Sequence, residues 1–137
     1  MLFKQVVGNL IIKKQLIEAV KNNRISHAQL FSGKKGCAKL AIALAYAQFL
    51  NCENSTKDDS CNTCSSCLKY NNLSHPDLHI IIPVLKTKKI KNPVSDHFVG
   101  VWRKFISDNY YCSLNDWTDS FGIENKSADQ GKIYVDE

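Results

Sequence analysis

Four closely spaced cysteines are the residues of this sequence most able to do chemistry. They are Cys52, Cys61, Cys64 and Cys67, in the pattern Cys-x8-Cys-x2-Cys-x2-Cys. Zinc binds four thiolates at about 2.3 Å in a tetrahedron, and a short Cys-x2-Cys turn presents two of them from one side. Two overlapping turns supply three ligands, and Cys52 supplies the fourth. The spacing therefore predicts a zinc site with no position left for water, whose role is structural and not catalytic.

Other interpretations of these cysteines stay open from the sequence. The six cysteines of the chain are an even number and could form disulfides, and four cysteines could hold an iron–sulfur cluster. His75 or His79 could replace one of the four ligands. A cytosolic chain is kept reduced, however, so clustered cysteines there more often bind a metal. We interpret the remaining two, Cys37 and Cys112, as ordinary thiols.

A second motif is a degenerate phosphate-binding loop. The consensus is G-x-x-x-x-G-K-[ST], and this chain has Gly-Lys-Lys-Gly-Cys-Ala-Lys-Leu, beginning at Gly33. Ala38 replaces the second glycine, whose missing Cβ permits positive φ and close approach of the backbone. Leu40 replaces the hydroxyl that holds Mg²⁺, and a leucine cannot do so. Any phosphate contact would come from Gly33, Gly36 and Lys39, and we do not expect ATP to bind productively.

The elements around these motifs indicate an α/β unit. Apolar residues at helical spacing predict a helix over 10–22, capped by Asn9 and with Lys13 facing outward. A short strand is predicted over 27–31, before the glycine loop, and a buried helix over 38–50, after it. A strand, a glycine-bearing loop and a buried helix in this order begin an α/β nucleotide-binding unit.

The rest of the chain is less regular. Residues 51–73 are polar and rich in cysteine, so we interpret them as an insertion folded by its metal and ending in a short helix. A β-branched run over 78–84 predicts a buried central strand. Apolar positions at i, i+3, i+4, i+7 and i+8 predict an amphipathic helix over 96–110, capped by Ser95 or Asp96.

Composition limits the class of protein. The chain has 137 residues, 44% of them hydrophobic, which is enough for a packed core. A net charge of +5 is compatible with nucleic-acid contact without demonstrating it. No segment has the about 18 consecutive apolar residues of a membrane helix, and the first residues lack the features of a signal peptide. We expect a cytoplasmic protein with no membrane partner. The polar stretch over 113–137 yields no prediction of regular structure.

The combination of motifs resembles the clamp-loader subunits of bacterial DNA polymerase III, namely gamma/tau and its relative delta prime. The resemblance is carried by residues 26–31, the loop from Gly33 to Lys39, the four cysteines, and His75-Pro76-Asp77 before an apolar strand. A later stretch, 102–126, resembles delta prime proteins of Bacteroidetes-type bacteria.

This resemblance implies an AAA+ P-loop-type three-layer fold. Residues 1–137 would be the N-terminal part of its clamp-loader domain, and 51–73 the zinc-binding insertion within it. The ATPase subunits of the family keep an intact P-loop, so Ala38 and Leu40 favour delta prime, which typically does not hydrolyse ATP. In the family, delta prime is the rigid member of a five-subunit ring that loads the sliding clamp onto primed DNA. The chain would then belong to the DNA polymerase holoenzyme without being catalytic itself.

The resemblance also implies partners. They are the gamma/tau and delta subunits and, through the assembly, the sliding clamp and primer-template DNA. Two other functions stay open from the sequence: an ATP-hydrolysing gamma/tau-type subunit, and a zinc-ribbon nucleic-acid-binding protein without P-loop ancestry. Tight Mg²⁺-dependent ATP turnover would indicate the former. Folding and DNA binding by residues 50–70 alone would indicate the latter.

Overall fold

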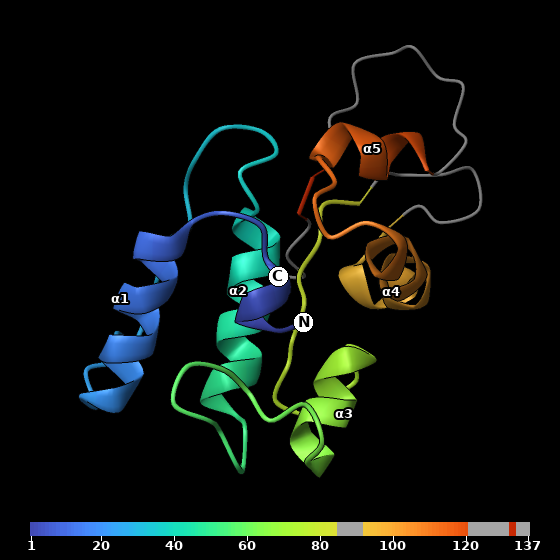
Figure 1. Cartoon of the computed structure of the whole chain (residues 1–137). Coiled ribbons are helices and arrows are strands. Elements are labelled where there is room, and N and C mark those ends of the chain that lie inside the picture. The colour runs from blue at the N-terminus through green and yellow to red at the C-terminus, as the bar shows by residue number, and fades with distance from the viewer. Residues whose placement is uncertain (85–91, 121–131, 134–137) are drawn as a thin grey trace. The chain divides into compact units, whose positions relative to one another are not determined.

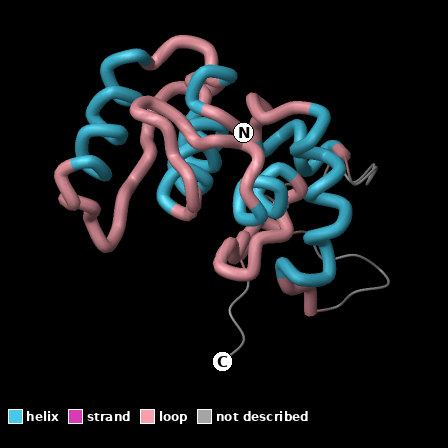
Figure 2. Tube along the Cα trace, turned by 60° about the horizontal axis from the view of Figure 1, so that its bottom comes forward, coloured by secondary structure: helices cyan, strands magenta, loops and turns pink. Residues whose placement is uncertain are grey.

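A computed structural model describes residues 1–84, 92–120 and 132–133 of the chain. The chain divides into two compact units, Met1–Leu78 and His79–Glu137. Helices are the regular elements of the described residues, and loops connect them (Figure 2). None of the helices found there is long and apolar enough to cross a membrane.

The first unit is built around one buried helix (Figure 1). Its elements are η1 (Phe3–Gln5), α1 (Leu10–Lys21), α2 (Lys39–Leu50) and α3 (Ser65–Asn71). Most side chains of α2 are buried, and this helix contacts η1, α1 and α3. Phe3 packs edge-to-face on Phe49 with ring centroids 5.7 Å apart, an arrangement that aromatic rings favour. The predicted apolar helix is therefore confirmed, and it is the core of this unit.

The predicted first helix is confirmed as α1, but its buried face differs from the prediction. Lys13, predicted to face outward, is buried, and its Nζ donates a hydrogen bond to the carbonyl oxygen of Val6. Ile12, one of the apolar residues at helical spacing from which this helix was predicted, is 43% exposed. Asn9 precedes the helix, but its side-chain amide donates to the Cys37 carbonyl oxygen at 3.2 Å and does not cap. A lysine stem is long and apolar, so burial is tolerated when the ammonium finds an acceptor.

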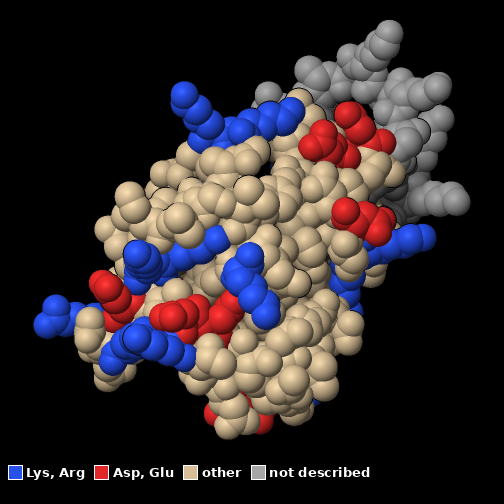
Figure 3. Space-filling model, viewed as in Figure 1, with Lys and Arg blue, Asp and Glu red and all other residues tan. Residues whose placement is uncertain are grey.

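The insertion is attached to the start of the chain by an aspartate. The carboxylate of Asp59 accepts hydrogen bonds from the backbone N–H groups of Phe3 and Lys4, each at 3.0 Å. Nearby, Lys21 and Asp58 form an exposed ion pair at 3.3 Å. Basic and acidic side chains likewise lie side by side on the face shown in Figure 3. Insertion, η1 and α1 are thus joined by polar contacts that the sequence did not reveal.

The second unit contains η2 (Ser95–Phe98), α4 (Val99–Asp108) and α5 (Leu114–Asp119) among its described residues. The predicted helix over 96–110 therefore divides into a 3-10 turn and an α-helix. Of its predicted apolar face, Val101 is 54% exposed, whereas Trp102 and Ile106 are buried. A helix as short as α4 can bury only a narrow face.

Helix α5 was not predicted. Ser113 and Asp116 form a capping box at its start, with the Ser113 Oγ accepting from the Asp116 N–H at 3.3 Å. Trp117 is 1% exposed, and its ring lies edge-on to Trp102 with centroids 4.9 Å apart. The signal in the sequence was the Ser-x-x-Asp spacing next to a tryptophan.

The α/β fold class is not shown by the described residues. The predicted strands over 27–31 and 78–84 are loop there, apart from one isolated antiparallel bridge at Val84. A strand requires a neighbouring backbone that pairs with its N–H and C=O groups. The backbone of Ile82 is instead satisfied by the Ser95 hydroxyl, at 3.0 Å to the N–H and 3.2 Å to the carbonyl. Neither Ser95 nor Asp96 is an N-cap, because Val94 and Phe98 precede η2 and α4, so the predicted cap was wrong.

Candidate metal centre and phosphate loop

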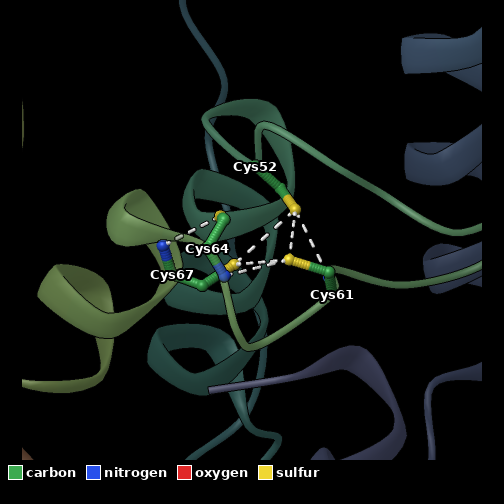
Figure 4. Close-up of side chains that lie close together, drawn as sticks. All are labelled: Cys52, Cys61, Cys64 and Cys67. Atoms are coloured by element: carbon green, nitrogen blue, oxygen red, sulfur yellow. Dashed lines mark hydrogen bonds between the residues drawn. The ribbon is translucent and has the colours of Figure 1, made fainter.

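The four predicted metal ligands converge near one end of α2 (Figure 4). Cys52 follows the C-terminus of α2, and Cys61 lies in the loop after it. Cys64 is the N-cap of α3, because its Sγ accepts a hydrogen bond from the Cys67 N–H at 3.4 Å. Cys67 lies in the first turn of that helix. Two helix ends and one loop thus bring the four thiols together.

The sulfur positions fit a tetrahedral metal ion. All four Sγ atoms lie within 4.8 Å of one another. The Sγ of Cys52 lies 3.5 Å from that of Cys61 and 3.6 Å from that of Cys67, and the last two are 3.9 Å apart. A tetrahedron of zinc–sulfur bonds of about 2.3 Å places its sulfurs about 3.8 Å apart. The residues present could therefore hold a metal ion, with a geometry that suits zinc.

The disulfide and His75 alternatives raised from the sequence find no support here, whereas the kind of metal or cluster stays a prediction. All six cysteines lie in the described part of the chain, and each is a free thiol. His75 is occupied elsewhere: its ring stacks on Tyr70 with centroids 4.6 Å apart, and its Nδ1 accepts from the Asp77 N–H at 3.2 Å. The group of possible ligands found among the described residues contains the four cysteines, and neither Cys37 nor Cys112 belongs to it.

Backbone N–H groups lower the pKa of these thiols, whereas burial raises it. The N–H of Cys61 donates to the Cys52 Sγ at 3.3 Å, and the N–H of Cys64 to the Cys61 Sγ at 3.4 Å. Backbone N–H groups of Thr63 and Cys64 lower the pKa of Cys61 to about 6, since they stabilise its thiolate. Burial raises the pKa of Cys67 to about 12 and also raises that of Cys52. A metal ion would displace the protons of the buried thiols on binding.

The loop before α2 holds its lysine against its own backbone. Lys39 is the first residue of α2, and its Nζ donates to the carbonyl oxygens of Gly33 and Lys34 at 2.8 and 3.0 Å. Ala38 has φ 63° and Gly36 has φ 78°. Positive φ suits glycine, so Ala38 occupies the conformation for which the consensus residue is glycine. Gly33 and Gly36 lie in this loop and Lys39 begins α2, and their contact with a phosphate stays a prediction.

Comparison with known proteins identifies the family. A family model described as DNA polymerase III, delta subunit, matches residues 8–107, which is most of the chain. The chain belongs to this family. The match covers the phosphate loop and all four clustered cysteines, so both motifs lie within the family's own domain and not beside it. The resemblance inferred from the motifs is confirmed at this level.

Individual relatives of the family carry two kinds of subunit name. DNA polymerase III subunit tau of Bacillus subtilis (strain 168) is 40% identical over 76 residues, which cover 56% of this chain and 14% of the relative. Subunit delta' of the same organism is 38% identical over 72 residues, which cover 53% of this chain and 22% of the relative. Subunit gamma/tau of Mycoplasma genitalium is 34% identical over 139 residues, which cover 97% of this chain and 23% of the relative. No solved structure matches the chain.

The chain spans less than a quarter of the length of each of these three relatives. Both delta' and gamma/tau occur among them at similar identity. The comparison therefore assigns the family but does not choose between the two kinds of subunit.

Proposed function

We propose that this chain is a delta prime-type member of the clamp-loader complex of DNA polymerase III. In this role it does not hydrolyse ATP. It acts in the cytoplasm with the gamma/tau and delta subunits, and helps load the sliding clamp onto primed DNA through the assembly. Its own contribution is a folded surface and not a chemical step.

The observation that carries this proposal is the residue at the metal position of the phosphate loop. Leu40 stands where a P-loop ATPase has a Ser or Thr hydroxyl bound to Mg²⁺, and a hydrocarbon side chain offers no ligand. Ala38 adds a Cβ at a left-handed position, and Lys39 is held by two carbonyl oxygens of the loop. Each change weakens a different part of the machinery that would hold MgATP.

The cysteine cluster supports a structural role for zinc in the same module. Four protein ligands fill a tetrahedral site, so no position is left for a water or a substrate. The ion would cross-link the insertion to the ends of α2 and α3. The segment from Cys52 to Cys64 is mostly exposed and has little core of its own. Metal binding therefore stabilises its fold.

Nucleotide binding and turnover test the proposal. Binding of ATP to the full chain is measured with Mg²⁺ and with EDTA, beside the variant Ala38→Gly/Leu40→Thr, which restores the consensus. We expect no Mg²⁺-dependent binding by the native chain and a gain of it in the double variant. Mg²⁺-dependent ATP turnover by the native chain, abolished by Lys39→Ala, would overturn the proposal.

The second candidate is an ATP-hydrolysing gamma/tau-type subunit. It is favoured by one specific observation, the 34% identity to a gamma/tau subunit over 97% of this chain. The same turnover measurement, made also on the assembled complex, separates the two candidates. Turnover that depends on Lys39 of this chain supports the second, and turnover that survives Lys39→Ala supports the first.

A further inference from the structure

Three buried polar side-chain atoms have no hydrogen-bond partner within the described residues. They are the Nε2 of Gln48 and the Oγ atoms of Ser60 and Ser66. The three side chains are only 1%, 5% and 6% exposed. A buried polar group without a partner costs about 1–3 kcal/mol, so such groups in native proteins call for an explanation.

All three side chains adjoin the cysteine cluster. Ser60 and Ser66 immediately precede Cys61 and Cys67 in the chain. Gln48 lies in the last turn of α2, and it is the exception in an otherwise apolar stretch of that helix. The orphaned donors of the described structure are therefore all neighbours of cluster cysteines along the chain or at the end of α2, and the cluster offers sulfur atoms as acceptors.

The orientation of the Gln48 amide follows from its other contact. Its Oε1 accepts a hydrogen bond from the N-terminal ammonium of Met1 at 2.7 Å. With Oε1 on this ammonium, the Nε2 donors of the same amide point away from it and have no partner within the described residues. The helix that contacts α2 in this unit and carries cluster cysteines is α3, and its Cys67 is the most buried of the four cysteines. Cys67 is therefore the acceptor to which we assign the buried amide.

Charge explains why a donor is needed at this position. A divalent ion with four thiolates carries two excess negative charges, and Cys67 is fully buried. Buried charge is tolerated when hydrogen bonds stabilise it. The N–H groups of Cys61, Cys64 and Cys67 donate to the sulfurs of Cys52, Cys61 and Cys64, in that order. A side-chain donor to the sulfur of Cys67 completes this pattern.

We infer that the Gln48 amide hydrogen-bonds and positions the metal-bound thiolate of Cys67, and that the Ser60 and Ser66 hydroxyls donate to the same group of sulfurs. This inference rests on the zinc site proposed above. Donors of this kind orient the ligands of a metal, and their loss weakens metal binding by about 10- to 100-fold. Gln48 is thus a positioning residue of the metal centre, supplied by the core helix.

Two substitutions of Gln48 in the full chain, with a matched control, test this role. Gln48→Met keeps the length of the side chain and removes the donor. Gln48→Glu keeps the acceptor for Met1 and places a carboxylate near the thiolates. The control is Tyr46→Phe, which removes a hydrogen bond to Gln29 of 3.0 Å from a buried residue of the same helix. Zinc affinity is measured by chelator competition, and the cobalt-substituted protein by its thiolate-to-cobalt charge-transfer band.

We expect Gln48→Met to weaken zinc binding about tenfold and to move the charge-transfer band to longer wavelength, because an unbonded thiolate is easier to oxidise. Gln48→Glu should weaken zinc binding further, and Tyr46→Phe should match the native chain. Equal affinity and an equal band in Gln48→Met and Tyr46→Phe would overturn the inference. If the Gln48 variants do not fold, Ser60→Ala/Ser66→Ala decides: it should weaken zinc binding, and unchanged binding overturns the inference.

Failure of the zinc site itself gives a different result. It would appear as a native chain without stoichiometric zinc, or as a Cys64→Ser variant that keeps its zinc. If only the role of Gln48 is wrong, the native chain holds one zinc and Cys64→Ser loses it.

Discussion

The ammonium of Lys39 donates to the carbonyl oxygen of Gly33 at 2.8 Å, so the first glycine of the phosphate loop and its lysine are hydrogen-bonded directly to each other. A second hydrogen bond of 3.0 Å joins the same ammonium to the Lys34 carbonyl oxygen. In an intact P-loop this lysine reaches the β- and γ-phosphates. Here a phosphate would have to draw the lysine away from two carbonyl oxygens. The lysine stabilises the shape of the loop.

The left-handed conformation of Gly36 can be tested by substitution. Its φ is 78°, and no atom lies within 4 Å of the position that a Cβ would take, so the cost of Gly36→Ala is conformational alone. We expect Gly36→Ala to lower the free energy of unfolding of the first unit by about 1 kcal/mol. Urea denaturation followed by far-UV circular dichroism measures it.

Gly100 supplies the matched control. It lies in α4 at an ordinary φ and has equally open space around it. Gly100→Ala should therefore stabilise the second unit by about 0.5–1 kcal/mol, because alanine favours the helix. Both tryptophans lie in that unit, so their fluorescence reports its unfolding. A loss of stability of similar size in both variants would contradict the conformational explanation.

Loss of one cysteine should release the metal. We expect Cys64→Ser to lose zinc and to destabilise the insertion while the phosphate loop and α2 stay largely folded, because α2 has an apolar core of its own. Metal analysis of the purified variants measures the zinc content. Cys112→Ser removes a thiol outside the cluster and should keep its zinc. Equal zinc content in Cys64→Ser and Cys112→Ser would contradict the assignment.

Zinc affinity should rise with pH. Burial raises the pKa of Cys67 to about 12 and also raises the pKa of Cys52, so both thiols carry protons at neutral pH and must release them to bind zinc. Backbone N–H groups lower the pKa of Cys61 to about 6, so this group is already a thiolate above that pH and releases no proton. Release of at least two protons predicts a rise of at least about a hundredfold in affinity per pH unit between pH 7 and 8.5. Chelator competition at several pH values measures it, and an affinity independent of pH would contradict it.

The indole of Trp117 should contribute to the stability of the second unit. Its Nε1 donates to the Pro83 carbonyl oxygen at 2.7 Å, and the residue is 1% exposed. Trp117→Phe keeps an aromatic ring but removes this donor, so we expect a loss of about 1–3 kcal/mol in the free energy of unfolding. The exposed neighbour Asp119 gives the control, since Asp119→Ala should change stability by less than about 0.5 kcal/mol. Denaturant unfolding compares the two, and similar losses would show that the Pro83 contact contributes nothing.

Local patterns in the sequence were sufficient to predict the candidate metal centre. The spacing of Cys61, Cys64 and Cys67 encodes two short turns, and a tetrahedral site needs little beyond such turns and one cysteine from a neighbouring helix. The apolar run after the phosphate loop could likewise be assigned to a buried helix, because a helix that is apolar nearly all round has no other stable place. Family membership followed from the order of these two motifs.

Only the tertiary structure decided which side chains complete the site and the core. The sequence shows Gln48 as a polar exception in α2 and Lys13 as a charged residue of α1. The burial of Gln48 depends on a contact with Met1, which is distant along the chain. The burial of Lys13 depends on a contact with Val6, which lies outside the helix. The predicted strand over 78–84 depended in the same way on a backbone partner, and a serine hydroxyl took that place at Ile82. Periodicity reports which face of an element is apolar, whereas hydrogen-bond partners are chosen by the fold as a whole.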